Sequence, residues 1–412
     1  MNRIDANLLG RRTVLSAAAL GMVGWLSNKT AFSQALIRPE QSGEVLVSLF
    51  LRGGMDGLNA IVPHGDDDYY RARPGISIAK NDVVDLDGFF GLNPSLRALY
   101  SPFLDGNLAI VHAVGSNDHT RSHFEAMNTM ERGLPDLHQN IGSGWIARLL
   151  DSRSEPNPSP LRAVAFSNVM PDALRGATGA VAIESLQQFR LQVREDAQQR
   201  KLLAKLYETG SDEVSIAGRE TLQVLDTLEN LNPSSYKPEH GAIYPASDLG
   251  AALRQVAFLI KNDIGLEVAC LDKGGWDTHV AQGATVGWLS SMLDDLGNSL
   301  AAFAKDMGRD LSKVTLVVQT EFGRRAYENS GLGTDHGRAS AMLIIGGNVI
   351  GGKVFSKWPT LNPAALDGPG DLKVTTDYRS VLGEILKKRL SGVDLATVFP
   401  GFDYSELGLI RA

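Results

Sequence analysis

The stretch that decides the fold is Glu-Val-Leu-Val-Ser-Leu-Phe-Leu-Arg-Gly-Gly-Met-Asp-Gly, residues 44–57. The run Glu44–Leu51 is almost entirely apolar and ends abruptly at a pair of glycines. An apolar run of this length, bounded by turn residues, predicts a strand that is buried on both faces. Asp56 follows this strand, and in open α/β sheets the loops beyond the carboxyl ends of the strands carry the functional site. The stretch therefore predicts an α/β fold and marks Asp56 as a candidate site residue.

Similar apolar runs recur along the chain and alternate with segments of helical spacing. The further predicted strands are Leu108–Val114, Leu161–Phe166, Leu266–Leu271, Val314–Gln319 and Ala341–Ile345. The predicted helices are a short one from Asn93-Pro94 toward Tyr100, then Ser122–Glu131, Arg194–Thr209, Ser247–Lys261, Ser290–Asp306 and Asp377–Arg389. Continuous apolar strands alternating with helices favour a doubly wound, mostly parallel sheet sandwiched by helices.

Residues 1–35 differ from the rest of the chain. Arg11 and Arg12 precede the apolar run Ala17–Leu26, and small residues at 31–35 offer a cleavage site. This pattern is typical of a twin-arginine signal peptide, which predicts export in the folded state to the periplasm or another extracytoplasmic compartment. The alternative is an ordinary secretory signal with a chance arginine pair. The apolar run is too short for a stable membrane span, which needs ~20 apolar residues.

The composition is that of an ordinary globular protein. The chain has 412 residues, 43% hydrophobic and 21% charged, with a formal net charge of −7. It therefore has no bulk basic field to attract nucleic acid. The single cysteine, Cys270, lies in an apolar strand pattern, which predicts a core thiol and excludes an intramolecular disulfide. We expect residues 36–412 to form a single domain, with a possible insertion or boundary at the Pro/Ser/Tyr-rich connection 232–245.

Residue types that bind metal ions follow or precede several predicted strands. The candidate ligands are Asp56, Asp277, His279, Glu321, Asp335 and His336. Carboxylate oxygens and imidazole nitrogens suit divalent Zn, Mn, Mg or Ca better than a thiolate site would. The sequence thus predicts a site for one or two divalent ions.

Each candidate ligand also has a purely structural interpretation. Asp56 could cap a helix, and Asp277-Thr278-His279 could be an Asx-turn with a surface histidine. Asp335-His336-Gly337 could be polar loop residues. Glu321 could form a salt bridge with Arg324 or Arg325. Four such groups, three of them at predicted strand ends, favour the metal-site interpretation.

Ser122 is the candidate nucleophile. It opens a predicted helix after a buried strand, in the pattern Ser-x-x-Glu of a capping box, and helix N-termini stabilise anions. Arg121 could hold a tetrahedral anion, and Thr120 is the reserve nucleophile. The structural alternative is that Ser122 only caps the helix. His119 and His123 could be metal ligands or groups that support ligands, and the sequence does not separate these roles.

Four ordered motifs resemble those of the domain-of-unknown-function 1501 family. They are LFLRGGMDGLNAIVP (49–63), HTRSHFEAMNTMERG (119–133), GGWDTH (274–279) and TEFGRR followed by EN and GTDHGRA (320–339). The resemblance covers nearly the whole chain from Glu44 on. It implies twin-arginine export and a relation to the superfamily of alkaline phosphatases, sulfatases and cofactor-independent phosphoglycerate mutases.

That relation implies an alkaline-phosphatase-like fold with a metal-dependent ester hydrolase site. Asp56 matches the aspartate after the first strand, and Ser122 matches the nucleophile at a helix start. Asp277 and His279 match one metal pair, and Asp335-His336-Gly337 is similar to the superfamily's Asp-His-Gly signature. Two departures are evident. Glu321 stands where an aspartate usually follows the strand, and the spacing of Asp277 and His279 is shorter than in phosphatases. Cys270 lies inside a strand pattern, which argues against a sulfatase-type modified cysteine.

These observations favour an exported metal-dependent hydrolase or transferase that acts on a phosphate or sulfate ester, either a small molecule or a polymer. The alternative is a non-catalytic envelope binding or assembly protein that keeps the metal for stability. Glycoside hydrolysis by paired carboxylates is a weaker interpretation, because it needs neither His279 nor His336.

Overall fold

The computed structural model describes residues 44–135, 141–153, 158–189 and 197–411. The predicted signal peptide, residues 1–35, lies outside the described residues. Within the described ranges, no helix combines the length and the apolar character that crossing a membrane requires.

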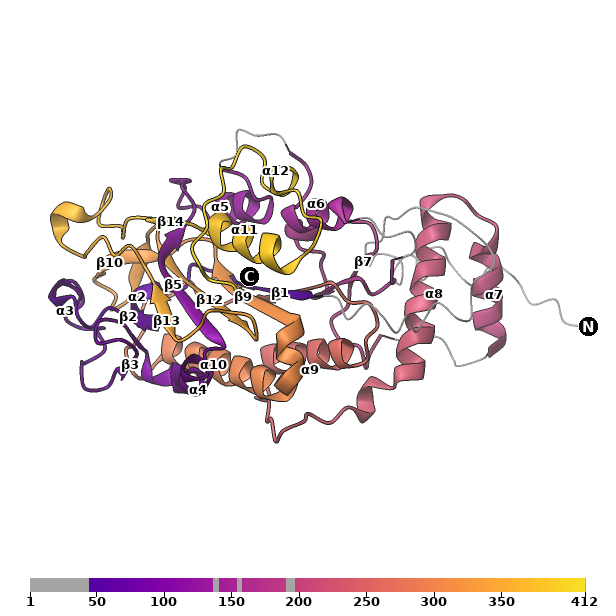
Figure 1. The fold of residues 1–412 in the computed structure, drawn as a ribbon, viewed down its shortest axis with the longest axis horizontal. Helices are drawn as coiled ribbons and strands as arrows, with labels where there is room; N and C mark the ends of the chain where they lie inside the picture. Colours follow the sequence, from indigo (N-terminus) through magenta and orange to yellow (C-terminus); the bar gives the residue numbers. More distant parts are fainter. Residues whose placement is uncertain (1–43, 136–140, 154–157, 190–196, 412) are drawn as a thin grey trace, which may run out of the picture.

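A large mixed sheet forms the centre of the described part of the chain (Figure 1). Its nine strands are β1 (Val45–Leu51), β5 (Leu108–Gly115), β6 (Ala163–Phe166), β7 (Ala180–Ala182), β8 (Val268–Lys273), β9 (Val314–Thr320), β12 (Ser340–Gly346), β13 (Lys353–Phe355) and β14 (Thr376–Asp377). The order is β13-β5-β12-β9-β1-β8-β6-β7, and β14 also pairs with β5. The strand β1 is central, as its fully buried apolar sequence requires.

Most neighbouring strands of this sheet are parallel. β1 pairs in parallel with β8 and β9, with Val47 opposite Ala269 on one side and Leu316 on the other. β12 is antiparallel to both of its neighbours, β5 and β9. All six predicted strands are present, which confirms the predicted mostly parallel α/β sheet.

Helices cover both faces of the sheet. Alternate residues of β1 point in opposite directions: Val45 and Val47 belong to the core under α9 (Asp248–Lys261) and α10 (Trp288–Met307). Leu46 and Phe50 pack in the core under α6 (Trp145–Ser152) and α11 (Tyr378–Arg389). The predicted doubly wound architecture is therefore confirmed.

Several elements differ from the sequence-based expectation. α5 (His123–Glu131), α7 (Ala197–Glu208), α9, α10 and α11 match predicted helices, but α6 and the long α8 (Glu213–Leu231) were not predicted. The segment from Asn93 forms a 3-10 turn, η1 (Pro94–Leu99), before α4 (Tyr100–Leu104). The remaining elements are α2 (Gly57–Ala60), β2 (Ile61–Val62), α3 (Asp67–Ala72), β3 (Val84–Asp85), β4 (Gly91–Leu92), η2 (Asp172–Leu174), η3 (Pro233–Ser235), η4 (Gly308–Lys313), β10 (Arg324–Glu328), β11 (Thr334–His336), η5 (Pro363–Ala365) and α12 (Leu395–Val398).

The connection 232–245 is held against the end of α10 by one carboxylate. Asp306, whose side chain is fully buried, accepts hydrogen bonds from the hydroxyls of Tyr236 and Tyr244, each at 2.8 Å. It also pairs with Lys261 of α9 at 2.8 Å. The connection is thus tied to two helices, while the expected insertion or boundary there stays a prediction.

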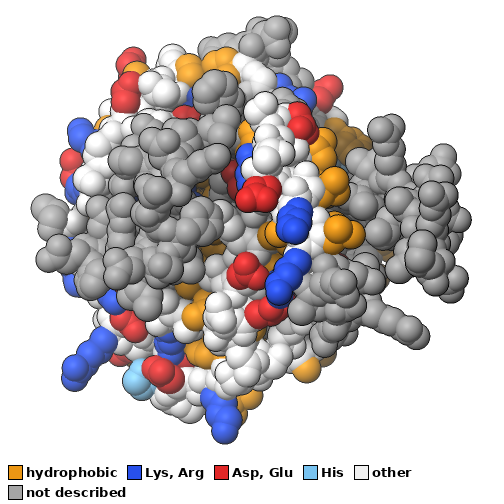
Figure 2. All heavy atoms as spheres, turned by 90° about the vertical axis from the view of Figure 1, so that its right-hand side faces the viewer, with side chains coloured by type: hydrophobic (Ala, Val, Ile, Leu, Met, Phe, Trp, Pro, Cys, Tyr) orange, Lys and Arg blue, Asp and Glu red, His pale blue; other side chains and the backbone are white. Residues whose placement is uncertain are grey.

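α7 and α8 lie at one end of the molecule (Figure 1). Figure 2 shows basic and acidic side chains interspersed over the described part of this face. Neither sign of charge forms a continuous field there, which fits the balanced composition.

Cys270 lies in β8 and is buried, as predicted. Burial raises the pKa of its thiol well above the ordinary value, so the group behaves as a small apolar core residue.

Candidate metal centre

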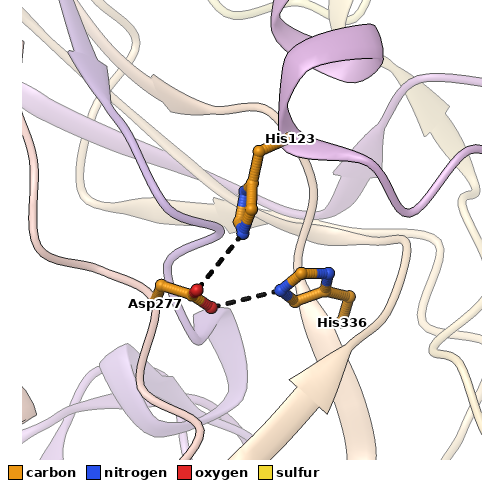
Figure 3. Close-up of side chains that lie close together, drawn as sticks. All are labelled: His123, Asp277 and His336. Carbon is orange, nitrogen blue, oxygen red and sulfur yellow. Dashed lines mark hydrogen bonds and ion pairs between the residues drawn. The ribbon is translucent and has the colours of Figure 1, made fainter.

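Three side chains from distant parts of the chain converge beyond the carboxyl ends of the central strands. His123 begins α5, Asp277 follows β8, and His336 ends β11 of the β10–β11 hairpin. Figure 3 shows the two imidazoles pointing at the Asp277 carboxylate. One potential ligand atom of each residue lies within 4.8 Å of those of the other two. The site thus lies where an open α/β sheet is expected to carry it.

The separations in this group suit a shared metal ion. His336 Nε2 lies 3.1 Å from Asp277 Oδ1, and His123 Nε2 lies 3.5 Å from Asp277 Oδ2. Ligands bound at about 2.0–2.1 Å around a tetrahedral ion are separated by roughly 3.3 Å. The three side chains therefore need little movement to bind one ion.

His279 adds a fourth donor to the same centre. Its Nε2 lies 3.1 Å from Asp277 Oδ1 and 2.9 Å from His336 Nε2. His279 belongs to the loop between β8 and α10, two residues after Asp277. The centre thus has three imidazoles and one carboxylate available.

Each of the three histidines directs its other ring nitrogen, Nδ1, at an oxygen of the protein. The partners are Glu321 Oε1 at 2.7 Å from His123, the Arg121 carbonyl at 2.8 Å from His336, and Asp335 Oδ1 at 3.5 Å from His279. An oxygen at Nδ1 places the proton on that nitrogen and leaves the Nε2 lone pair free. Metal-binding histidines almost always have such a partner.

One ring nitrogen of the centre, His123 Nε2, is left unsatisfied by the surrounding protein groups. It is buried and has no hydrogen-bond partner among the residues that the structure describes, a state that is costly for a polar atom unless another group satisfies it. A divalent cation between His123, Asp277 and His336 would satisfy it. The residues therefore fit such an ion.

Arg324 holds the loops of the site together. It is fully buried, and its guanidinium donates to the carbonyls of Gly54 at 2.7 Å, Thr334 at 2.9 Å and Trp276 at 3.1 Å. It also donates to Asp277 Oδ1 at 2.6 Å. Partial burial raises the pKa of Asp277, but the hydrogen bond and charge of Arg324 outweigh this and lower it to about 2. Asp277 is therefore an anion at any ordinary pH.

The pKa values of two histidines move in opposite directions. The hydrogen bond that His123 donates to the Glu321 carboxylate raises the pKa of His123 above its ordinary value. Burial lowers the pKa of His336. A cluster of partly buried imidazoles with divergent pKa values is typical of a functional site.

Asp56 is not part of the converging group. Its carboxylate accepts from Leu58 N at 3.2 Å and so caps α2, and it pairs with the fully buried Arg73 at 2.6 Å. Gln282 donates to the same Oδ2 at 2.6 Å. The capping interpretation of Asp56 is thus confirmed, and its charge is already balanced by Arg73.

Glu321 and Asp335 lie behind the histidines, on the side away from the centre. The structural alternative for Glu321, a salt bridge with Arg324 or Arg325, is not observed, because the Glu321 carboxylate binds His123 and the backbone N–H of Gly53, each at 2.7 Å. Arg325 pairs instead with Asp335 at 3.3 Å. The two carboxylates therefore orient imidazoles.

Ser122 lies at the N-cap of α5, as predicted, but its side chain makes no capping hydrogen bond. The predicted Ser-x-x-Glu capping box is wrong, since Glu125 accepts from Thr120 Oγ1 at 2.6 Å and Ser122 N donates to the same hydroxyl at 3.2 Å. The hydroxyl of Thr120, the reserve nucleophile, is thus engaged twice. Ser122 directly precedes His123, about 3.8 Å away between Cα atoms.

Two partly exposed arginines flank the centre. Arg121 (35% exposed) and Arg325 (31% exposed) share the buried carboxylate of Asp371. Arg121 also contributes the carbonyl behind His336, and Arg325 contacts the Asp335 carboxylate behind His279. A border of two arginines, each paired with a carboxylate, therefore adjoins the histidines.

The residue whose role the sequence did not settle is His123. Its position as the first helical residue after a polar loop at a strand end was the available signal. His119 is exposed and, among the described residues, takes part in no potential metal-binding group.

Comparison with known proteins places the chain in a family. The model of a family described as a protein of unknown function (DUF1501) matches residues 44–382, and the chain belongs to that family. No curated protein matches. Among solved structures, the phosphonate monoester hydrolase of Agrobacterium radiobacter is similar with 9% sequence identity and a TM-score of 0.33, over 88% of this chain and 78% of that chain.

Proposed function

We propose that this DUF1501 protein is a metal-dependent hydrolase or transferase that acts on a phosphate or sulfate ester outside the cytoplasm. The observation that carries the proposal is the arrangement of three imidazoles around Asp277, each with an oxygen behind Nδ1. The twin-arginine pattern at residues 11–12 supports the extracytoplasmic location.

The proposed ligands are His123, Asp277, His279 and His336. Three nitrogen donors and one oxygen donor favour zinc among the divalent ions considered. His123, Asp277 and His336 offer ligand atoms within 4.8 Å of one another, and His279 adds a donor next to His336 and Asp277, so the proposal is one ion at this group. Asp56, Glu321 and Asp335 leave the proposed ligand set, because each binds other protein groups.

When bound, a divalent ion supplies Lewis acidity that polarises an ester and stabilises the charge on its departing oxygen. Arg121 and Arg325 bind the anionic phosphoryl or sulfuryl group from the side, because both guanidinium groups are partly exposed beside the histidines. The arginines and the centre together position the ester for in-line attack.

Ser122 is the proposed nucleophile. Its hydroxyl is not used in capping α5, and it lies at the positive end of that helix. Its oxygen bonds to phosphorus or sulfur while the bond to the alcohol oxygen breaks, and the hydroxyl proton of Ser122 passes to that departing oxygen, so that a neutral alcohol leaves. Water or an acceptor alcohol then releases the anion from Ser122.

The test combines metal analysis with an ester screen on the purified full chain. We expect about one zinc ion per chain, and turnover of p-nitrophenyl phosphate, phosphonate or sulfate esters. His336→Ala should lose both, whereas His240→Ala, which removes a half-exposed histidine elsewhere, should keep both. Metal binding without turnover of any ester would instead support the non-catalytic binding or assembly protein. A wild-type protein that binds no metal would refute both the metal-dependent enzyme and the metal-stabilised binding protein.

A further inference from the structure

Large apolar side chains are exposed on the segments that carry the candidate ligands. Phe124 (84% exposed) directly follows His123, and Val280 (72% exposed) directly follows His279. Trp288 (60% exposed) and Leu332 (55% exposed) complete what we call the apolar rim: Phe124, Val280, Trp288 and Leu332. Single exposed apolar residues are ordinary, but several beside one site mark a binding surface.

Hydrogen bonds hold three members of the rim on adjoining loops. Ala281 N donates to the Gly331 carbonyl at 2.8 Å, and Gln282 N donates to the Leu332 carbonyl at 2.9 Å, so Val280 and Leu332 lie on paired segments. Trp288 donates through Nε1 to the Gly275 carbonyl at 2.9 Å, two residues before Asp277. The rim is therefore fixed to the same loops that present the proposed ligands.

Phe124 approaches from the opposite element, α5. The His123 ring packs on the His336 ring, with 4.3 Å between centroids, so the start of α5 is held next to the β10–β11 hairpin. Thr120 and Glu125 bind each other around this start of the helix and do not cover Phe124. The rim thus has one member on α5 and three on the loops that follow β8 and join β10 to β11.

We infer that this site takes anionic esters whose alcohol part is apolar, with the rim binding an alkyl or aryl group. The inference rests on the proposed function, since the centre and the two arginines bind the anionic end. The charged residues of the border, Arg121 and Arg325, fit the anion, and the rim offers the apolar contact that neither of them supplies.

The test measures equilibrium binding, which does not depend on turnover. Methyl-, butyl- and octylphosphonate are titrated into the zinc-loaded full chain by calorimetry. Burial of a methylene contributes about fourfold in affinity when complete, so partial contact with the rim predicts between about twofold and fourfold for each methylene. Phe124→Ser and Val280→Ser should flatten this dependence on chain length.

The matched control is Ile243→Ser, which removes an equally exposed apolar side chain (85%). Ile243 lies in the connection tied to Asp306 near the C-terminal end of α10, whereas Trp288 begins that helix. The 20 residues of α10 span about 30 Å. We expect the control to keep the chain-length dependence of the wild type.

The inference would be overturned if the affinity did not depend on chain length. It would also be overturned if the gain in affinity per methylene were the same in Phe124→Ser and Val280→Ser as in the wild type. Binding to phosphatidylcholine vesicles that Phe124→Ser abolishes while soluble phosphonates show no chain-length effect would overturn it as well, because the rim would then serve a membrane surface. A chain-length effect in a protein that turns over no ester would keep the inference and remove the hydrolase proposal.

Discussion

The Nε2 atoms of His279 and His336 lie 2.9 Å apart. When both rings carry their proton on Nδ1, facing the oxygen behind it, the two Nε2 lone pairs face each other and repel. Negative charge from Asp277, 3.1 Å from both atoms, adds to this repulsion. A cation at this point relieves it, so binding of a metal should stabilise the folded protein.

Zinc should therefore raise the melting temperature. A ligand present at about a thousand times its Kd adds ~4 kcal/mol to the free energy of unfolding. We expect a rise of several degrees in the wild type and none in His279→Ala or His336→Ala, measured by calorimetry with and without zinc. His240→Ala should respond as the wild type does. An unchanged melting temperature in the wild type would argue against a metal at this point.

Glu321→Gln should weaken metal binding without removing a proposed ligand. Glu321 accepts from His123 Nδ1 at 2.7 Å and so sets the orientation of that ring. Loss of such a partner typically costs 10- to 100-fold in metal affinity. Competition with a chromophoric chelator measures the change. Equal affinities of the variant and the wild type would show that Glu321 does not orient His123.

Asp306 should make part of the stability pH-dependent. Burial raises the pKa of Asp306, but Lys261, the backbone of Glu239 and two tyrosine hydroxyls lower it below its ordinary value in total. A lowered folded-state pKa gives stability that is present above the unfolded-state pKa, near 4, and is lost as pH falls through the folded-state value.

We therefore expect Asp306→Asn to unfold more easily than the wild type at pH 7, by about 3 kcal/mol, because a buried charge pair loses one partner. This difference should shrink as pH falls below about 4. Melting temperatures between pH 3 and 7 check it. Asp294→Asn, at an exposed position of the same helix, is the control. A difference that is constant over this range would exclude the proposed titration.

Much of the fold was predictable because β1 and the other buried strands are short continuous apolar runs, whose pattern needs no knowledge of partners. The site was predictable only in part. Asp277, His279 and His336 were predicted from their types and positions, and they lie together. The role of Asp56, however, depends on Arg73, which no local pattern links to it. Likewise, Glu321 was assigned as a ligand because the sequence does not reveal that His123 lies opposite it.

The C-terminal segment should detach when Glu384 loses its charge. The fully buried carboxylate of Glu384 accepts four backbone N–H groups, those of Leu407, Gly408, Leu409 and Ile410, at 2.6 to 2.9 Å. An amide side chain keeps one acceptor oxygen and turns donors toward donors, so Glu384→Gln should cost about 2–3 kcal/mol. Hydrogen exchange of the amides at 407–410 should rise sharply. Glu406→Gln, which changes an exposed carboxylate, should leave them protected.

Ser122→Ala is the decisive test of the proposed nucleophile. The Ser122 side chain makes no hydrogen bond to the first turn of α5, so its removal should leave stability within about 0.5 kcal/mol. If Ser122 forms the covalent intermediate, kcat for ester hydrolysis should fall by about a thousandfold or more, with zinc content unchanged.

Thr120→Ala should instead destabilise the start of α5, because Thr120 bonds both Glu125 and the Ser122 amide. Its activity should therefore change far less than that of Ser122→Ala. Near wild-type turnover by Ser122→Ala, together with a large loss in Thr120→Ala, would transfer the role to the threonine, since the Glu125 carboxylate at 2.6 Å could then accept its proton.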